Sequence, residues 1–325
     1  MRARLVFIAS LAVASALTGG DAQAGPTLER LRASGIIHCG AIERPGLFEA
    51  TAQGTSGLLA DLCRAIGVAA FGPSVKVETT VYDSEASFAT LRDGRDDIAF
   101  LSGGETEQEK LTDRLIPGPP VAFVDVALMV PRTATVNKPA DLASQPICFL
   151  QGDAAHRALE AYFAQSGLSF LRMGYQEEDE LHDAFDAGQC RGLVGEATTL
   201  ASVRLAGQNN LRGARILAQP LARFPILAFT NRDDQAWSAL VAWTIDALVA
   251  GDRPKQAWSA GNAEALPLGD ALGLRPNAVN DMLAATGGYS AMVLRNLGDG
   301  SPLALPPGDN ALVERGGLLT PPYSE

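Results

Sequence analysis

The sequence has little positive charge. Its 325 residues include 26 lysines and arginines against 37 aspartates and glutamates, which gives a net charge of −11. Nucleic acids and anionic membranes are polyanions, and they attract basic surfaces. We therefore do not expect this chain to bind either of them non-specifically, and we predict no nucleic-acid partner.

Signatures of catalysis and metal binding are also scarce. The chain has only three histidines, and each stands alone in the sequence: His38, His156 and His182. Its four cysteines form no C-x-x-C pair, and no H-E-x-x-H or G-x-S-x-G motif occurs. We predict no catalytic residue, no metal site and no cofactor.

Only one long hydrophobic run is present, and it lies at the start. Leu5 to Leu17 is uncharged, follows Arg2 and Arg4, and precedes the small-x-small sequence Ala22-Gln23-Ala24. This pattern is typical of a secretory signal peptide, and the run is too short to span a bilayer. We predict a signal peptide over residues 1–24, cleavage after Ala24 and a periplasmic location. Losing two arginines and one aspartate would take the charge from −11 to −12.

The cysteines fit an exported protein. An even number of cysteines outside the cytosol favours disulfides over free thiols. Four cysteines leave three connectivities open, and the simplest has one bridge in each half of the chain. The residues concerned are Cys39, Cys63, Cys148 and Cys190.

Helical and strand-like segments alternate along the chain. Hydrophobic residues make up 47% of it, which is enough for a large core and, at this length, for two domains. Apolar periodicity predicts helices over residues 28–33, 58–71, 87–91, 154–165, 178–187, 198–205 and 235–250. It predicts strands over 36–39, 75–81, 98–101, 121–130, 147–150, 170–175, 192–194 and 226–230.

This order predicts an α/β protein with two lobes, each a mostly parallel sheet flanked by helices. We expect two hinge strands, near Val126–Pro131 and Ile226–Thr230, to join the lobes. Residues 25–130 and 228–325 would form lobe 1 with a C-terminal extension, and residues 131–227 would form lobe 2. A ligand cleft is expected between them, because ligands bind beyond the carboxyl ends of parallel strands and hinged lobes close around them.

Ordered motifs along the mature chain carry a family resemblance. The N-terminal and central ones are Gly35 to Gly40, Asp61-Leu62-Cys63-Arg64-Ala65, Gly94, Asp97-Ile98, Val130-Pro131, Gln151-Gly152, Asp179-Glu180-Leu181 and Trp243-Thr244. The most specific ones are Gly288-Tyr289, Arg295-Asn296-Leu297-Gly298, Ser301-Pro302-Leu303, Asn310-Ala311-Leu312 and Gly316-Gly317-Leu318. Through these motifs, the chain resembles the periplasmic solute-binding proteins of ABC transporters. The resemblance is specifically to the general L-amino-acid-binding type within the two-lobed type 2 class.

The resemblance implies a fold, partners and a disulfide pairing. It implies the type 2 periplasmic-binding-protein fold, with a small-molecule ligand held between the lobes and handed to an ABC permease in the inner membrane. It further implies a monomer, with Cys39 paired to Cys63 and Cys148 paired to Cys190.

The resemblance also identifies a ligand site, from which this sequence departs. The family's pattern Asn-Thr-Thr-Trp-Thr-x-x-Arg supplies an arginine for the ligand carboxylate, and here the stretch runs from Ser102 through Glu105 and Thr106 to Glu109. Glutamates therefore replace both the tryptophan and the arginine. Lys110 or Arg114 would have to swing in to restore a cation.

The second half of the site keeps a group for a cation. Gly152-Asp153 replaces the family's Gly-Thr, and Glu196 stands at the position of the family's ammonium-binding aspartate. Glu109, as part of T-x-x-E, and Asp153, before a helix, would also serve as helix caps. The predicted ligand-binding residues are Ser102, Glu105, Thr106, Glu109, Gly152, Asp153 and Glu196.

The expected function is capture of an amino acid or a related amine-bearing ligand for import, without enzymatic activity. A carboxylate in place of an arginine repels an anionic ligand group, whereas Glu196 attracts an ammonium. Two alternatives stay open at this point. One is a diverged binding protein with a different ligand or a partner-interaction role, and the other is a periplasmic dehydratase-like enzyme on the same fold.

Overall fold

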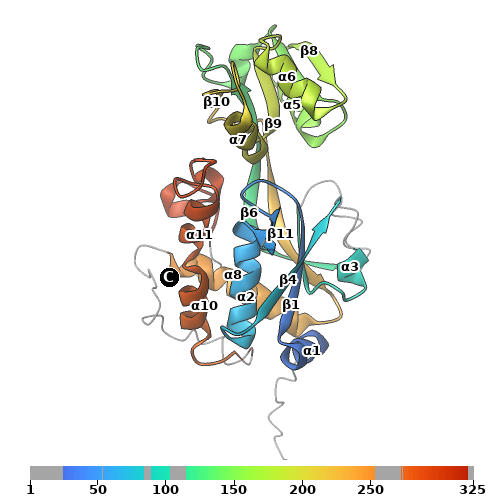
Figure 1. Ribbon diagram of the computed structural model, residues 1–325, viewed down its shortest axis with the longest axis vertical. Coiled ribbons are helices and arrows are strands. Elements are labelled where there is room, and N and C mark those ends of the chain that lie inside the picture. Colours follow the sequence, from blue (N-terminus) through green and yellow to red (C-terminus); the bar gives the residue numbers. More distant parts are fainter. Residues whose placement is uncertain are drawn as a thin grey trace, which may run out of the picture.

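The computed structural model of the protein describes residues 25–52, 54–83, 89–102, 115–252, 272 and 274–320. The predicted signal peptide over residues 1–24 lies outside this range. Within the described residues, no helix is long and apolar enough to cross a membrane. Figure 1 shows two lobes stacked along the long axis, with two long strands running between them.

The elements follow the predicted alternation of strands and helices. The strands are β1 (Ile36–Ile42), β2 (Glu49–Thr51), β3 (Gly54–Ser56), β4 (Lys76–Tyr82), β5 (Ile98–Ser102), β6 (Leu115–Val130), β7 (Pro146–Leu150), β8 (Leu171–Tyr175), β9 (Gly192–Glu196), β10 (Arg215–Ile216) and β11 (Ala222–Asn231). The α-helices are α1 (Pro26–Ser34), α2 (Leu58–Phe71), α3 (Ala89–Arg92), α5 (Ala154–Gln165), α6 (Glu178–Asp186), α7 (Ala197–Ala206), α8 (Gln235–Gly251), α10 (Ala278–Thr286) and α11 (Tyr289–Asn296). Short 3-10 helices are η2 (Pro139–Leu142), η3 (Gly308–Asn310) and η4 (Val313–Arg315).

One sheet runs through both lobes. Its strand order is β4-β1-β5-β11-β6-β9-β7-β8, with β10 paired to β6. The pairs β4–β1–β5 in lobe 1 and β9–β7–β8 in lobe 2 are parallel, and the long strands β6 and β11 join them by antiparallel pairing. The fold is therefore α/β with a parallel core in each lobe and two connecting strands.

The change from one core to the other occurs within the β6–β11 pair. On β6, Val124 packs in the core of lobe 1 and Val126 packs in the core of lobe 2. On β11, Phe224 packs against the core of lobe 2 and Ile226 lies in that of lobe 1. We propose that the lobes meet at this point, which is earlier in β6 than the predicted boundary at residue 130.

Strand β6 begins earlier than the sequence suggests. The predicted strand started at Val121, and the three prolines before this residue have no N–H to donate to a ladder. In the structure β6 starts at Leu115, and its ladder with β11 is irregular between Ile226 and Phe229, opposite Pro120 and Pro117. The ladder thus accommodates the prolines through shifts in register.

Both disulfides implied by the family resemblance are formed. Cys39 of β1 is bonded to Cys63 of α2, and Cys148 of β7 is bonded to Cys190 just before β9. The paired cysteines are 24 and 42 residues apart in the sequence. Closing loops of this length in the unfolded chain stabilises the folded state by roughly 3–4 kcal/mol per bridge.

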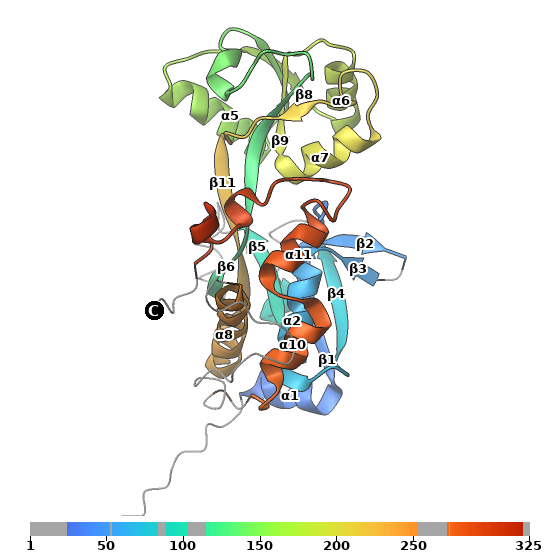
Figure 2. The ribbon, with the colours of Figure 1, turned by 90° about the vertical axis from the view of Figure 1, so that its left-hand side faces the viewer.

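A C-terminal extension packs on lobe 1 and reaches the connecting strands. Helices α10 and α11 lie alongside α2 (Figure 2), and the buried hydroxyl of Tyr289 donates to the carbonyl of Val121, 2.8 Å away. The side chain of Asn310 accepts from the N–H of Phe123 at 2.7 Å and donates to its carbonyl at 3.0 Å. The extension therefore completes the hydrogen bonding of β6 where the strand leaves lobe 1.

Candidate functional site

A cavity of about 290 Å³ lies where the two lobes meet. Lobe 1 contributes Ile42, at the end of β1, and the next two residues, Glu43 and Arg44. Lobe 2 contributes the carboxyl ends of β7 and β9, the starts of α5 and α7, and one side of α6. The lobe 2 residues are Leu150, Asp153, Ala154, Ala155, Glu178, Leu181, His182, Val194, Gly195, Glu196, Thr199 and Leu200.

Glu196 has a fixed backbone position, and its carboxylate is not used by its own helix. It is the last residue of β9, where it pairs with Val126 of β6, and it also occupies the N-cap position of α7. Its side chain makes no capping hydrogen bond to that helix. Because the carboxylate is not used by the helix, it can point across the cavity.

Arg44 meets Glu196 from the other lobe. Its Nε lies 3.1 Å from Oε2 and 3.4 Å from Oε1 of Glu196. The side chains are 14% and 27% exposed, respectively, so the ion pair is largely shielded but still reachable from solvent. Such a pair contributes on the order of 1 kcal/mol, because loss of hydration offsets most of the attraction.

The backbone of Arg44 is fixed by a tight turn. Its N–H donates to the carbonyl of Phe48 at 2.9 Å, and its carbonyl accepts from the N–H groups of Leu47 and Phe48 at 3.0 and 2.9 Å. Leu47 and Phe48 are buried in the core of lobe 1. The turn therefore presents the guanidinium at the mouth of the cavity from a rigid base.

Arg44 was not among the predicted site residues. The predicted strand ended at Cys39, which put Arg44 well inside a polar loop, whereas β1 runs on to Ile42. Arg44 thus follows directly beyond the carboxyl end of a parallel strand, where ligand-binding groups gather. The available signal was the apolar pair Ala41-Ile42, which extends the strand.

Asp153 lies in the cavity wall and caps helix α5. Its carboxylate accepts from the N–H of His156 at 2.6 Å, the bond expected of an N-cap. Burial raises the pKa of Asp153, while that hydrogen bond and the nearby His156 and Arg157 lower it, with burial the larger effect. The predicted role of Asp153 as an N-cap is confirmed. Contact between Asp153 and a ligand stays a prediction.

The rest of the described wall adds acidic groups. Glu43 and Glu178 stand in it with Asp153 and Glu196, whereas its cationic side chain is Arg44. His182 is also present, but burial lowers its pKa, so it is mainly neutral at neutral pH. Within the described residues, no three His, Cys, Asp or Glu side chains gather closely enough to hold a metal ion.

The other predicted site residues divide into two groups. Ser102 ends β5 opposite Ile226, and Gly152 donates its N–H to Nδ1 of His156 at 3.1 Å; neither is among the described residues of the cavity wall. Glu105, Thr106 and Glu109 lie outside the described residues, as do Lys110 and Arg114. Their places in the site remain predictions.

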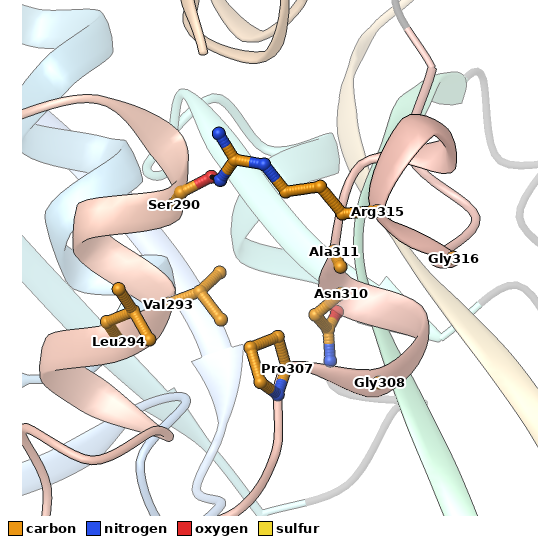
Figure 3. A pocket seen from close by; sticks show the side chains of 9 residues that line it. All are labelled: Ser290, Val293, Leu294, Pro307, Gly308, Asn310, Ala311, Arg315 and Gly316. Carbon is orange, nitrogen blue, oxygen red and sulfur yellow. Dashed lines mark hydrogen bonds between the residues drawn. The ribbon is translucent and has the colours of Figure 1, made fainter. Parts of the chain in front are cut away.

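A second cavity, of about 260 Å³, lies within the C-terminal extension. Figure 3 shows it between α11, which contributes Val293 and Leu294, and the segment around Pro307 and Asn310. The guanidinium of Arg315 crosses its rim and donates to Oγ of Ser290 at 3.4 Å. This cavity contains none of the predicted site residues.

The fold and the cleft define a class of protein. Two α/β lobes joined by paired long strands, with a cavity where they meet, make up the type 2 periplasmic-binding-protein fold, as predicted. A solved periplasmic binding protein of an ABC transporter from Brucella ovis, with glutathione bound, has a TM-score of 0.73 and 25% sequence identity. The match covers 91% of this chain and 98% of that one.

Curated relatives give the more particular comparison. The general L-amino acid-binding periplasmic protein AapJ of Rhizobium johnstonii is 27% identical over 97% of both chains. The glutamate/glutamine/aspartate/asparagine-binding protein BztA of Rhodobacter capsulatus is 26% identical over 98% of both. No family model matches the chain. These full-length similarities confirm the predicted relationship to the solute-binding proteins of amino-acid ABC transporters, which are transport proteins rather than enzymes.

Proposed function

We propose that this protein is the periplasmic solute-binding component of an ABC importer and captures an amino acid or a related small amine-bearing ligand between its lobes. The observation that carries this proposal is the carboxylate of Glu196. It stands in the cavity, faces the opposite lobe and is not used to cap its own helix. A carboxylate placed in this way binds an ammonium group through charge-assisted hydrogen bonds.

The surroundings of Glu196 support a ligand with an amino group. Glu43, Asp153 and Glu178 make the described wall predominantly negative, which favours a cationic group on the ligand. The names of AapJ and BztA give amino acids as their ligands, and the glutathione bound to the Brucella protein also has a free amino group. An amine is thus a chemical feature that these ligands share.

Export and delivery form part of the proposal. The periplasmic relatives and the N-terminal sequence pattern support secretion with cleavage after Ala24. In this role the protein acts as a monomer that binds ligand, closes, and docks with both lobes on an ABC permease in the inner membrane. It carries out no chemistry on the ligand.

A thermal-shift screen of the purified mature protein tests this function. The panel contains the common L-amino acids, glutathione, polyamines and quaternary amines. We expect at least one ligand with an amino group to raise Tm, because a ligand that binds only the folded state stabilises it. A panel that leaves Tm unchanged throughout contradicts the proposal.

The substitution Glu196→Gln tests whether Glu196 binds the ammonium group of the ligand. It keeps the shape of the side chain but removes the charge that binds the ammonium, so we expect Kd for the best ligand to rise at least about tenfold. Glu177→Gln is the matched control, because Glu177 is an exposed N-cap without a side-chain cap bond and lies outside the cavity wall. Isothermal titration calorimetry measures both, and equal affinities in the two variants would rule out this role for Glu196.

A further inference from the structure

We infer that Arg44 binds the carboxylate of the ligand while Glu196 binds its ammonium, so that the protein selects a zwitterion over a simple amine. This inference rests on the proposed function and names the chemical class of its ligand. The structure brings together one guanidinium and one carboxylate, from opposite lobes, at the cavity. These are the two groups that complement the two charges of an α-amino acid.

Backbone hydrogen bonds hold both Arg44 and Glu196 in place, as is typical of residues in a binding site. The turn from Arg44 to Phe48 fixes the backbone of Arg44, and the ladder with Val126 fixes that of Glu196. The two residues are 152 positions apart in sequence and meet only because the lobes do. Each lobe therefore supplies one charge, and a ligand that contacts both also joins the lobes.

The cavity beside the pair has the size of a small metabolite. Its volume of about 290 Å³ lies near the lower end of ligand pockets, which span roughly 300–1,000 Å³. Glu196 remains 27% exposed, so an entering ligand can reach the ion pair from solvent. An amino acid fits this space, with its two charged groups directed at the rim where Arg44 and Glu196 meet.

Charge balance explains why a zwitterion is favoured. An α-amino acid replaces the Arg44–Glu196 contact with two contacts of the same kind, ammonium to Glu196 and carboxylate to Arg44. A simple amine competes with Arg44 for Glu196 and brings no carboxylate for the guanidinium, which is only 14% exposed to water. Removing one partner of a shielded ion pair is costly, so the amine binds less tightly.

Other wall groups are less suited to either task. Asp153 is committed to the N–H of His156, and His182 is mainly neutral at neutral pH because burial lowers its pKa. Glu43 and Glu178 add negative charge but cannot bind a carboxylate. Among the described residues of the wall, Arg44 is thus the side chain that can receive the anionic group.

The experiment compares matched ligands on the wild-type protein by calorimetry. The ligands are the amino acid that gives the largest thermal shift, its carboxamide, and the amine that lacks the carboxylate. We expect the carboxamide and the amine to bind at least about tenfold more weakly, which corresponds to about 1.4 kcal/mol. Equal affinity for all three overturns the inference and leaves the proposed function intact.

Variants of Arg44 then assign the effect to this residue. Arg44→Met should weaken binding of the amino acid at least about tenfold and remove the preference over the carboxamide, whereas Arg44→Lys should restore part of both. Arg64→Met, an exposed position on α2 outside the cavity, is the control for loss of one positive charge. Circular dichroism verifies that each variant is folded.

Each outcome bears on the inference. If Arg44→Met retains the preference for the acid over the carboxamide, Arg44 serves only to hold the lobes together and the inference is wrong. A wild-type protein that binds no member of the ligand panel contradicts the proposed function, and the inference falls with it.

Discussion

Two N-cap residues at the cavity use their carboxylates in different ways. Asp153 caps α5 through the N–H of His156, whereas Glu196 makes no such bond to α7 and pairs with Arg44 instead. Aspartate has the short side chain that N-cap geometry requires, and glutamate is not among the favoured N-cap residues. A Glu at this position thus leaves a charge available for the cleft at little cost to the helix.

The cap role of Asp153 predicts a loss of stability on truncation. Asp153→Ala should lower the free energy of unfolding by about 1 kcal/mol, because the N–H of His156 loses its acceptor. Asp153→Asn keeps an oxygen for the cap and should retain most of the stability. Urea denaturation followed by circular dichroism measures both variants, and equal losses in the two would argue against the cap.

At the scale of elements, the C-terminal extension forms an ion pair with one of the connecting strands. Arg223 of β11 forms an ion pair with Asp309 of η3 and lies 3.7 Å from Asp125 of β6, its partner in the ladder. Two carboxylates therefore share one guanidinium where the strands pass between the lobes. Burial, followed by the nearby charge of Asp309, raises the pKa of Asp125 to about 6.

This raised pKa predicts a pH-dependent contribution to stability. The ordinary pKa of 3.8 applies in the unfolded chain, so between about 4 and 6 the folded state holds the extra proton. The contribution of Asp125 is thus fully present at low pH and is lost as the pH rises through about 6. Asp125→Asn should flatten the fall in stability over this range, as measured by urea denaturation at a series of pH values.

Asp246 on α8 provides the comparison for that measurement. Burial raises its pKa to about 6 as well, so it adds to the same slope from a different part of lobe 1. Asp125→Asn should remove one part of the slope, and the double variant with Asp246→Asn should remove more. A slope that is unchanged in Asp125→Asn would show that the carboxylates of the connecting strands do not hold the proton.

At the scale of the whole molecule, the two lobes are joined by side-chain contacts across the cleft as well as by the sheet that runs through both. One is the Arg44–Glu196 ion pair, and another is the bond from Arg204 of α7 in lobe 2 to the carbonyl of Leu303 in the C-terminal extension, at 2.8 Å. The connecting strands permit hinge bending, which is the usual motion of two lobes around a ligand. We therefore expect these contacts to bias the lobes toward the arrangement that the structure shows.

Loss of both contacts should open the ligand-free protein. We expect the double variant Arg44→Met/Arg204→Met to have a larger radius of gyration than the wild type in small-angle X-ray scattering. Identical scattering from the two ligand-free proteins would show that these contacts do not bias the lobes.

The sequence predicted most of the regular structure because local patterns determine it. The predicted bounds of α2 and α5 match the structure, since apolar spacing and end residues such as Gly72 and Asp153 act within one helix. It did not predict α10 and α11, whose helices pack on α2, nor the hairpin of β2 and β3, which it treated as loop. The early start of β6 was missed because its prolines pair with β11 through an irregular ladder.

The α/β class, the two-lobed arrangement and the place of Glu196 at a cleft could be predicted without the structure, because hydrophobic periodicity and ordered motifs are properties of the chain. Only the tertiary structure brought Arg44 to Glu196, since their meeting depends on how far β1 extends and how the lobes are placed. The glutamates at the family's tryptophan and arginine positions suggested a cleft without a cation in the expected loop. Folding brought Arg44 to the cleft from a distant turn, because electrostatic pairing acts between neighbours in space and not along the chain.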